Sequence, residues 1–289
     1  MRSILKPQDP QFEISAVYKM CIDGVSDEVL RDAFNMSTEY IVAAAKEYDS
    51  AGKNSTFVEL LPNDIDKNLA FLNGLSKDQF IKLYSNQFVS KELPRTAVYD
   101  QLKSRAPYGK CPFCGYCDVD QLDHYLPKSK YPLLTVLPIN LVPSCPYCNG
   151  GKNAEIAEKP EDQILHPYYD HCLIMETQWI FAFVVHEKPA VVKYFVRTPP
   201  QFDDIESRRI ENHFRTNHLA TRYSTQAADQ ISTFPYTLED FYSNGGAENV
   251  RKYLLSQHKA EYQRFKNSWQ TAMYLALAED SWFCSGGFR

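Results

Sequence analysis

Two Cys-x-x-Cys pairs lie in the middle of the chain, Cys111 with Cys114 and Cys145 with Cys148. Four thiolates suit a tetrahedral zinc ion, because each pair places two sulfurs on the metal and the second pair closes a long loop. Reduced thiols and a redox-active pair are the alternatives, although a single exchange reaction needs only one pair. The spacing therefore predicts a structural Zn²⁺ site. The nearby Cys117 either replaces Cys114 as a ligand or is a bystander.

The loop between the pairs carries an Asp-His pair, Asp123 and His124, and Asn149 directly follows the last cysteine. The ordinary pKa of histidine is about 6.5, so His124 can take a proton from water near neutral pH. Asp123 and Asn149 offer oxygen ligands, which suit Mg²⁺ or Mn²⁺. Phosphodiester hydrolysis needs an activated water and a stabilised leaving oxygen. The residue types fit that reaction, although an Asp-His pair taken alone is usually an ordinary hydrogen bond.

Three further side chains are candidates for the same site. Lys128 and Lys152 can contact phosphate, or they can be ordinary solvated lysines. His166 can be a further metal ligand, a partner that orients a ligand, or a structural histidine at the exit of the segment. Residues 101–153 hold six Lys and Arg against three Asp, a net charge of +3, whereas the whole chain carries -5. A locally basic segment fits the handling of phosphate, although the bias is small.

Short elements must position these residues. The stretches LDH and TVLPINLVP indicate two short strands around a proline-rich crossing. The stretch SCPYCNGGKNAEIAE indicates a turn that leads into a helix. The order β, β, α can bring Asp123 and Asn149 to one point, with His124 beside them.

The segment from about Tyr108 to His166 resembles the zinc-stabilised HNH endonucleases. The resemblance rests on CxxC, LDHYLPKSKYP, NLVP and CxxCNxxK in this order, and it covers about a fifth of the chain. Asn149 stands where many members of the family have histidine. The resemblance implies an α+β fold with a zinc-stabilised ββα-metal core, and catalytic roles for His124, Asp123, Asn140 and Asn149. It assigns Asn140 to orienting the loop that carries the base, whereas capping of a turn is the simpler alternative.

The resemblance implies a metal-dependent endonuclease that hydrolyses phosphodiester bonds in DNA. RNA as the substrate and a non-catalytic zinc module that binds nucleic acid or protein are the alternatives, and nothing in the sequence separates DNA from RNA. Similar chains are HNH effectors of bacterial anti-phage systems of the Septu type or associated with retrons, where the nuclease accompanies an ATPase subunit. An ATPase subunit is therefore the expected partner. The sequence leaves the oligomeric state open.

The flanking regions are expected to support this core. Residues 1–100 are expected to be mostly helical, with helices over Ser26–Tyr48, about Asp64–Leu72 and the stretch SKDQFIKLYSNQF. Residues 101–171 form the expected nuclease core. Residues 172–289 begin with two β-rich runs, QWIFAFVV and AVVKYFV, which indicate a hairpin, and continue as helices. The sequence therefore predicts a helical region, a zinc-bearing core and a mostly helical α+β region.

The composition is that of an ordinary globular chain. The 289 residues are 44% hydrophobic and 23% charged, and the eight cysteines include the two tight pairs. We find no apolar run of about 18 residues that would span a membrane. The first residues, MRSILKPQDPQFEIS, lack the apolar core of a secretory signal. Together with the metal-type cysteine spacing, these features favour the cytoplasm.

Overall fold

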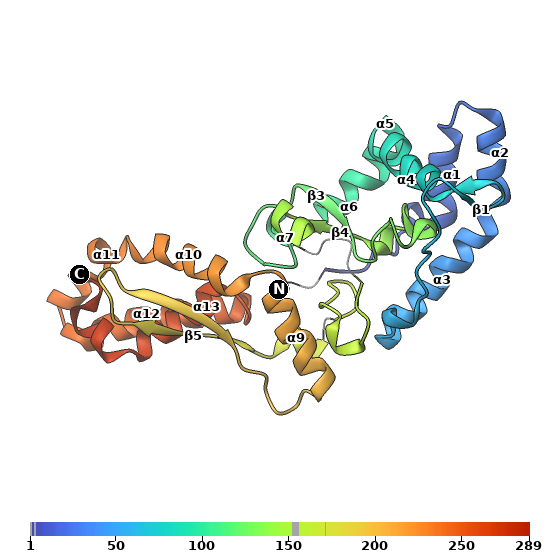
Figure 1. Ribbon diagram of the computed structural model, residues 1–289. Coiled ribbons are helices and arrows are strands. Elements are labelled where there is room, and N and C mark those ends of the chain that lie inside the picture. Colours follow the sequence, from blue (N-terminus) through green and yellow to red (C-terminus); the bar gives the residue numbers. More distant parts are fainter. Residues whose placement is uncertain (1, 3, 152–155, 171) are drawn as a thin grey trace. The chain divides into compact units, whose positions relative to one another are not determined.

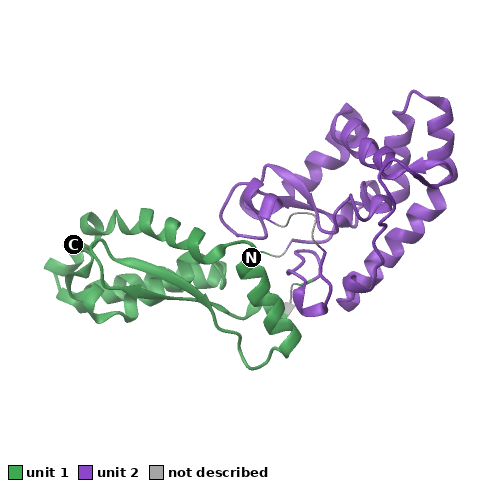
Figure 2. Ribbon diagram, in the orientation of Figure 1, with its two compact units in different colours: residues 1–2, 170–289 green, residues 3–169 purple. Residues whose placement is uncertain are grey.

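The computed structural model of the chain describes residues 2, 4–151, 156–170 and 172–289. The chain divides into two compact units, one formed by residues 3–169 and the other by residues 1–2 with 170–289 (Figure 2). Both are built mostly of helices with small two-stranded sheets, so the chain is α+β. Among the described residues, no helix combines the length and the apolar character that a membrane crossing requires.

The unit of residues 3–169 begins with helices. Its N-terminal helices are α1 (Ile14–Asp23), α2 (Glu28–Met36) and α3 (Thr38–Asn54), shown in blue in Figure 1. The predicted single helix over Ser26–Tyr48 is therefore wrong in one respect, because it breaks at Ser37. The Ser37 hydroxyl donates to the carbonyl of Ala33 at 2.9 Å, a local bond that competes with continued helix.

The beginning of α2 also differs from the prediction. Asp27, rather than Ser26, is the N-cap, and its carboxylate accepts the backbone N–H of Leu30 at 3.0 Å. Val29 does not start an apolar face, because it is 82% exposed.

The predicted helix over about Asp64–Leu72 is wrong. That segment ends in strand β1 (Ala70–Leu72), which pairs with β2 (Leu75–Ser76). Asn73 and Gly74 connect the strands with φ of 49° and 81°. Both central residues of a type I′ hairpin turn need positive φ, and Asn-Gly is the favoured pair there. This two-residue turn was the signal that the helical interpretation overlooked.

Helical structure then continues to the first cysteine pair. Ser76 caps α4 (Lys77–Lys82) in a capping box with Gln79. The chain continues through a π-helical segment, η3 (Leu83–Val89), and reaches α6 (Asp100–Ser104) through α5 (Glu92–Pro94) and the π-helical η4 (Arg95–Tyr99). The predicted helix in SKDQFIKLYSNQF is confirmed, with its second half wound as π-helix.

The segment that contains the cysteine pairs holds one hairpin and one short helix, drawn in green in Figure 1. Strand β3 (Gln121–His124) pairs antiparallel with β4 (Leu141–Ser144), and α7 (Pro146–Gly151) follows directly. Helix α6 packs against both strands. The chain between the strands is wound into two short 3-10 turns, η6 (Pro132–Leu134) and η7 (Pro138–Asn140), each with proline in its first turn.

The second unit is a hairpin covered by helices. Strands β5 (Ile180–Val185) and β6 (Val191–Val196) pair antiparallel, which confirms the predicted hairpin. Helix α13 (Trp269–Glu279) packs on β5 and α10 (Leu219–Ile231) packs on β6. The described part of this unit also contains α8 (Cys172–Glu176), α9 (Asp204–Thr216), α11 (Phe234–Ser243), α12 (Gly246–Arg264) and the π-helical η9 (Phe283–Gly287).

Candidate functional site

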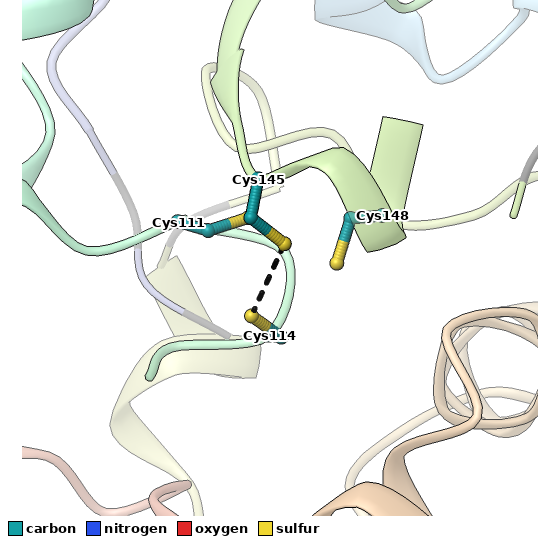
Figure 3. Close-up of side chains that lie close together, drawn as sticks. All are labelled: Cys111, Cys114, Cys145 and Cys148. Atoms are coloured by element: carbon teal, nitrogen blue, oxygen red, sulfur yellow. Dashed lines mark hydrogen bonds between the residues drawn. The ribbon is translucent and has the colours of Figure 1, made fainter. Parts of the chain in front are cut away.

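The four cysteines of the two pairs converge on one point (Figure 3). The sulfurs of Cys111, Cys114, Cys145 and Cys148 all lie within 4.8 Å of one another, and each residue is at most 1% exposed. The Sγ atoms of Cys114 and Cys145 are 3.9 Å apart. Zn–S bonds of about 2.3 Å in a tetrahedron place the sulfurs about 3.8 Å apart. The cluster therefore has the size that a zinc ion needs.

The electrostatics of the cluster favour a cation. Hydrogen bonds from Cys111 and Cys117 lower the pKa of Cys114, whereas hydrogen bonding with Cys111 and the other thiols raises the pKa of Cys148. Four buried thiols this close cannot all ionise without a compensating charge, because each thiolate repels the next. A divalent metal supplies that charge, so these four cysteines could hold an ion such as zinc.

The backbone holds the first cysteine pair in a tight turn. The N–H of Cys111 donates to the carbonyl of Cys117 at 2.8 Å, and the N–H of Gly115 donates to the carbonyl of Cys111 at 2.7 Å. Gly115 has φ of 77°, a conformation that favours glycine. Cys117 is half-buried and outside the group of four, and its carbonyl closes the turn. The cluster therefore takes Cys114 as its member in this pair.

Asp123 and His124 end strand β3. In the hairpin register, Asp123 lies opposite Val142 and His124 opposite Leu141. The Nε2 atom of His124 lies 2.8 Å from the backbone carbonyl of Thr135. A carbonyl only accepts, so Nε2 carries the proton and Nδ1 is the basic nitrogen of the neutral ring. The fold thus fixes the tautomer of His124.

Asp123 is a buried carboxylate, 5% exposed. Burial and neighbouring phenols raise the pKa of Tyr48 and Tyr84, and the charge of Asp123 adds a smaller contribution to both. A folded protein tolerates a buried carboxylate when a cation or hydrogen-bond donors offset the cost of removing its charge from water. Among the described residues, the one group of His, Cys, Asp and Glu side chains found close enough to hold a metal is the four-cysteine cluster, so the ion expected at Asp123 and Asn149 stays a prediction.

Asn140 is fully buried and bridges two parts of the loop between the strands. Its Oδ1 accepts the backbone N–H of Leu126 at 2.8 Å. Its Nδ2 donates to the carbonyls of Leu126 at 3.1 Å and Leu134 at 3.3 Å. Its own carbonyl accepts the N–H of Tyr125 at 2.8 Å. These contacts hold in place the chain directly after His124.

The remaining sequence candidates of the loop and of α7 are placed as follows. Asn149 is half-buried in α7, and its backbone N–H donates to the carbonyl of Cys145 at 3.1 Å. Lys128 is half-buried with its Nζ 4.6 Å from the centre of the Tyr84 ring. Lys152 lies outside the described residues.

His166 is held inside the unit by both ring nitrogens. The N–H of Tyr168 donates to Nδ1 at 3.1 Å, so Nε2 carries the proton and donates to the Tyr48 hydroxyl at 2.9 Å. The ring is fully buried and stacks on Phe57 at 5.4 Å. With both nitrogens used in this way, the geometry favours the structural alternative over the metal-ligand one.

Two contacts of His124, with Thr135 and with Tyr84, were not predicted from the sequence. Thr135 contributes its backbone carbonyl, which any residue could supply, so no side-chain pattern marks it. Tyr84 comes from the N-terminal helical region and lies 4.5 Å from His124 between ring centres. Its one available signal was the aromatic spacing of Tyr84 and Phe88 in SKDQFIKLYSNQF, which indicates only a packed helix face.

Comparisons with known proteins give two relatives. The chain is 27% identical to protein ea31 of Escherichia phage lambda over 294 aligned positions, covering 96% of this chain and 98% of that protein. It is 39% identical to the Septu protein PtuB of Bacillus thuringiensis over 85 residues, covering 29% of this chain and 32% of that protein. No protein-family profile matches the chain. No solved structure matches it either.

Proposed function

We propose that the chain is a metal-dependent HNH endonuclease that hydrolyses phosphodiester bonds in DNA. The observation that carries the proposal is the 2.8 Å hydrogen bond from Nε2 of His124 to the carbonyl of Thr135. It leaves Nδ1 as the nitrogen that can take a proton, which is what a general base must offer. A zinc module that only binds has no need of a histidine whose tautomer is fixed in this way.

Five of the candidate residues have a role in the proposed reaction. Asp123 and Asn149 would hold a divalent ion, which supplies charge stabilisation to the phosphate and the leaving oxygen when bound. His124 takes a proton from the water that attacks phosphorus, and the bond from phosphorus to the 3′ oxygen breaks. Asn140 keeps the loop after His124 in place. Lys128 offers a positive charge to the phosphate.

A role in anti-phage defence is part of the proposal. It is supported by the partial similarity to a Septu protein and by the buried cysteine cluster within the segment that resembles HNH nucleases. A chain that cut DNA freely would damage its own cell. We therefore propose that an ATPase partner subunit controls the activity, and that the site works in the cytoplasm.

The experiment compares two matched histidine variants. Zinc-loaded wild type, His124→Asn and His218→Asn are incubated with supercoiled plasmid and Mg²⁺ or Mn²⁺. Asparagine keeps a polar side chain at this position, but it cannot act as a general base. His218 is an exposed histidine with φ of 51°, a conformation that asparagine tolerates. We expect wild type and His218→Asn to nick or linearise the plasmid and His124→Asn to lose the activity.

Other results would redirect or end the proposal. If His124→Asn folds correctly and keeps full activity, His124 is not the general base and the HNH nuclease assignment is rejected. Cleavage of RNA but not of DNA, still lost in His124→Asn, would move the substrate to RNA. Binding of nucleic acid without cleavage in either metal, alone and with a co-expressed ATPase partner, would favour the non-catalytic zinc module.

A further inference from the structure

The ring of Tyr84 contacts two candidate residues of the site at once. Its centre lies 4.5 Å from that of the His124 imidazole, with the ring planes at 65°. The Nζ atom of Lys128 lies over the same ring, 4.6 Å from its centre. The ring comes from outside the cysteine-bearing segment, because Tyr84 belongs to the π-helical η3 in the N-terminal helical region.

The position of Tyr84 is set by its own neighbours. The ring stacks on Phe88 at 5.5 Å, and Phe88 in turn packs against Tyr99 at 6.0 Å. Tyr84 is 8% exposed and Phe88 is fully buried, so this aromatic row is part of the core of the unit. Wider π-helical turns change the direction of side chains within a helix and occur frequently at functional sites.

The loop that bears Lys128 is anchored to the N-terminal region at further points. Lys130 forms an ion pair with Asp64, and its carbonyl accepts the N–H of Asn63 at 2.8 Å. The Tyr131 hydroxyl donates to the carbonyl of Leu60 at 3.0 Å. These bonds hold Lys130 and Tyr131 against residues 60–64. Both anchored residues directly follow the part of the loop where Lys128 meets Tyr84. Contacts from the N-terminal region therefore help to hold the loop of the proposed nuclease segment in place.

We propose that Tyr84 is a positioning residue that orients His124 with its ring and holds the Lys128 ammonium over the ring face for a phosphate. The inference rests on the proposed function, because it assigns Tyr84 to the same reaction. The aromatic face attracts a cation and fixes where the charge lies. Among the described residues, Lys128 makes no ion pair, so its charge is available to an anionic ligand. Burial also lowers the pKa of Lys128, as expected for an ammonium that has lost part of its hydration.

The substitution Tyr84→Leu removes the ring and keeps apolar volume, and Tyr84→Phe is its matched control. The Tyr84 hydroxyl makes no hydrogen bond within the described part of the chain, so phenylalanine preserves both ring contacts. We expect Tyr84→Phe to stay within about twofold of wild type in kcat and KM. We expect Tyr84→Leu to raise KM by about 3- to 10-fold, the range of a cation–π contact. Its kcat should fall by about 10-fold or more because the base is misplaced.

A double-mutant cycle separates positioning from packing. If Tyr84 acts on phosphate binding through Lys128, adding Tyr84→Leu to Lys128→Met will not raise KM further. Purely structural damage would instead add to the Lys128→Met effect. Additive KM changes in the cycle, or unchanged kcat and KM in Tyr84→Leu, would overturn the proposal.

An NMR measurement distinguishes the positioning role of Tyr84 from the proposed nuclease function. The ring current of Tyr84 should shift the imidazole proton signals of His124, assigned by comparison with His124→Asn. The shift should persist in Tyr84→Phe and disappear in Tyr84→Leu. If the wild type shows this pattern but is inactive, the nuclease proposal is rejected and the contact between Tyr84 and His124 is retained. If the His124 signals are unchanged in a folded, active Tyr84→Leu variant, the positioning role of Tyr84 is rejected and the nuclease proposal is retained.

Discussion

Replacing Asn140 by alanine should destabilise the unit of residues 3–169 far more than the same change at Asn149. Asn140 is fully buried, and its amide makes three hydrogen bonds to the backbone of Leu126 and Leu134. Alanine removes all three and offers no replacement. Asn149 is half-buried, and its side chain makes no hydrogen bond among the described residues.

The magnitude follows from the groups left behind. The N–H of Leu126 lies in the interior and loses its acceptor, which costs about 1–3 kcal/mol. The two carbonyls lose one donor each, at about 0.5–1.5 kcal/mol per bond. We expect the free energy of unfolding to fall by about 3 kcal/mol in Asn140→Ala. Asn149→Ala should stay within about 0.5 kcal/mol, as for a surface substitution.

The assay is urea unfolding of the zinc-loaded chain followed by far-UV circular dichroism and by tryptophan fluorescence. All three tryptophans, Trp179, Trp269 and Trp282, belong to the other unit, so their fluorescence is an internal control. The fluorescence transition should not move in either variant. A change of less than 0.5 kcal/mol in Asn140→Ala would refute the reasoning. Equal losses in both variants would show that Asn140 has no special role in the loop.

Three further outcomes are expected. Cys148→Ser should lower bound zinc from one ion per chain, measured by elemental analysis, and should lower the melting temperature to that of chelator-treated wild type. His166→Ala should cost about 2–4 kcal/mol, because it empties a buried aromatic site and leaves the Tyr48 hydroxyl without its partner, while metal content stays unchanged. Burial opposes ionisation of Asp49, yet hydrogen bonds from two lysines and a tyrosine outweigh it and lower its pKa from 3.8 to about 2. The folded pKa lies below the ordinary one, so this stabilisation is present above about pH 4 and fades as the pH falls toward 2. Asp49→Asn should flatten that acid limb of a stability profile.

Local signals in the sequence were sufficient for several elements. The β-rich runs before and after HEKP determined the hairpin β5–β6, because strand alternation and a short polar turn need no distant information. The serine before KDQF determined the start of α4 through its capping box. The helix expected over Asp64–Leu72 failed because a two-residue Asn-Gly turn outweighed a weak helical pattern.

The cysteine spacing by itself indicated a four-sulfur metal site, since two Cys-x-x-Cys pairs can satisfy one tetrahedral ion. It could not decide whether Cys114 or Cys117 joins the other three. The tertiary structure made that choice, because it groups the sulfur of Cys114 with those of Cys111, Cys145 and Cys148 within 4.8 Å of one another.

The tertiary structure alone decided how the candidate site is oriented. The tautomer of His124 depends on the carbonyl of Thr135, and the ring beside it comes from Tyr84, 40 positions earlier in the chain. The bonds that use both nitrogens of His166 come in part from Tyr48, more than a hundred positions away. A motif states which side chains are present, whereas these contacts arise only when distant segments pack together. The residue types were therefore readable from the sequence, and their protonation and placement were decided by the fold.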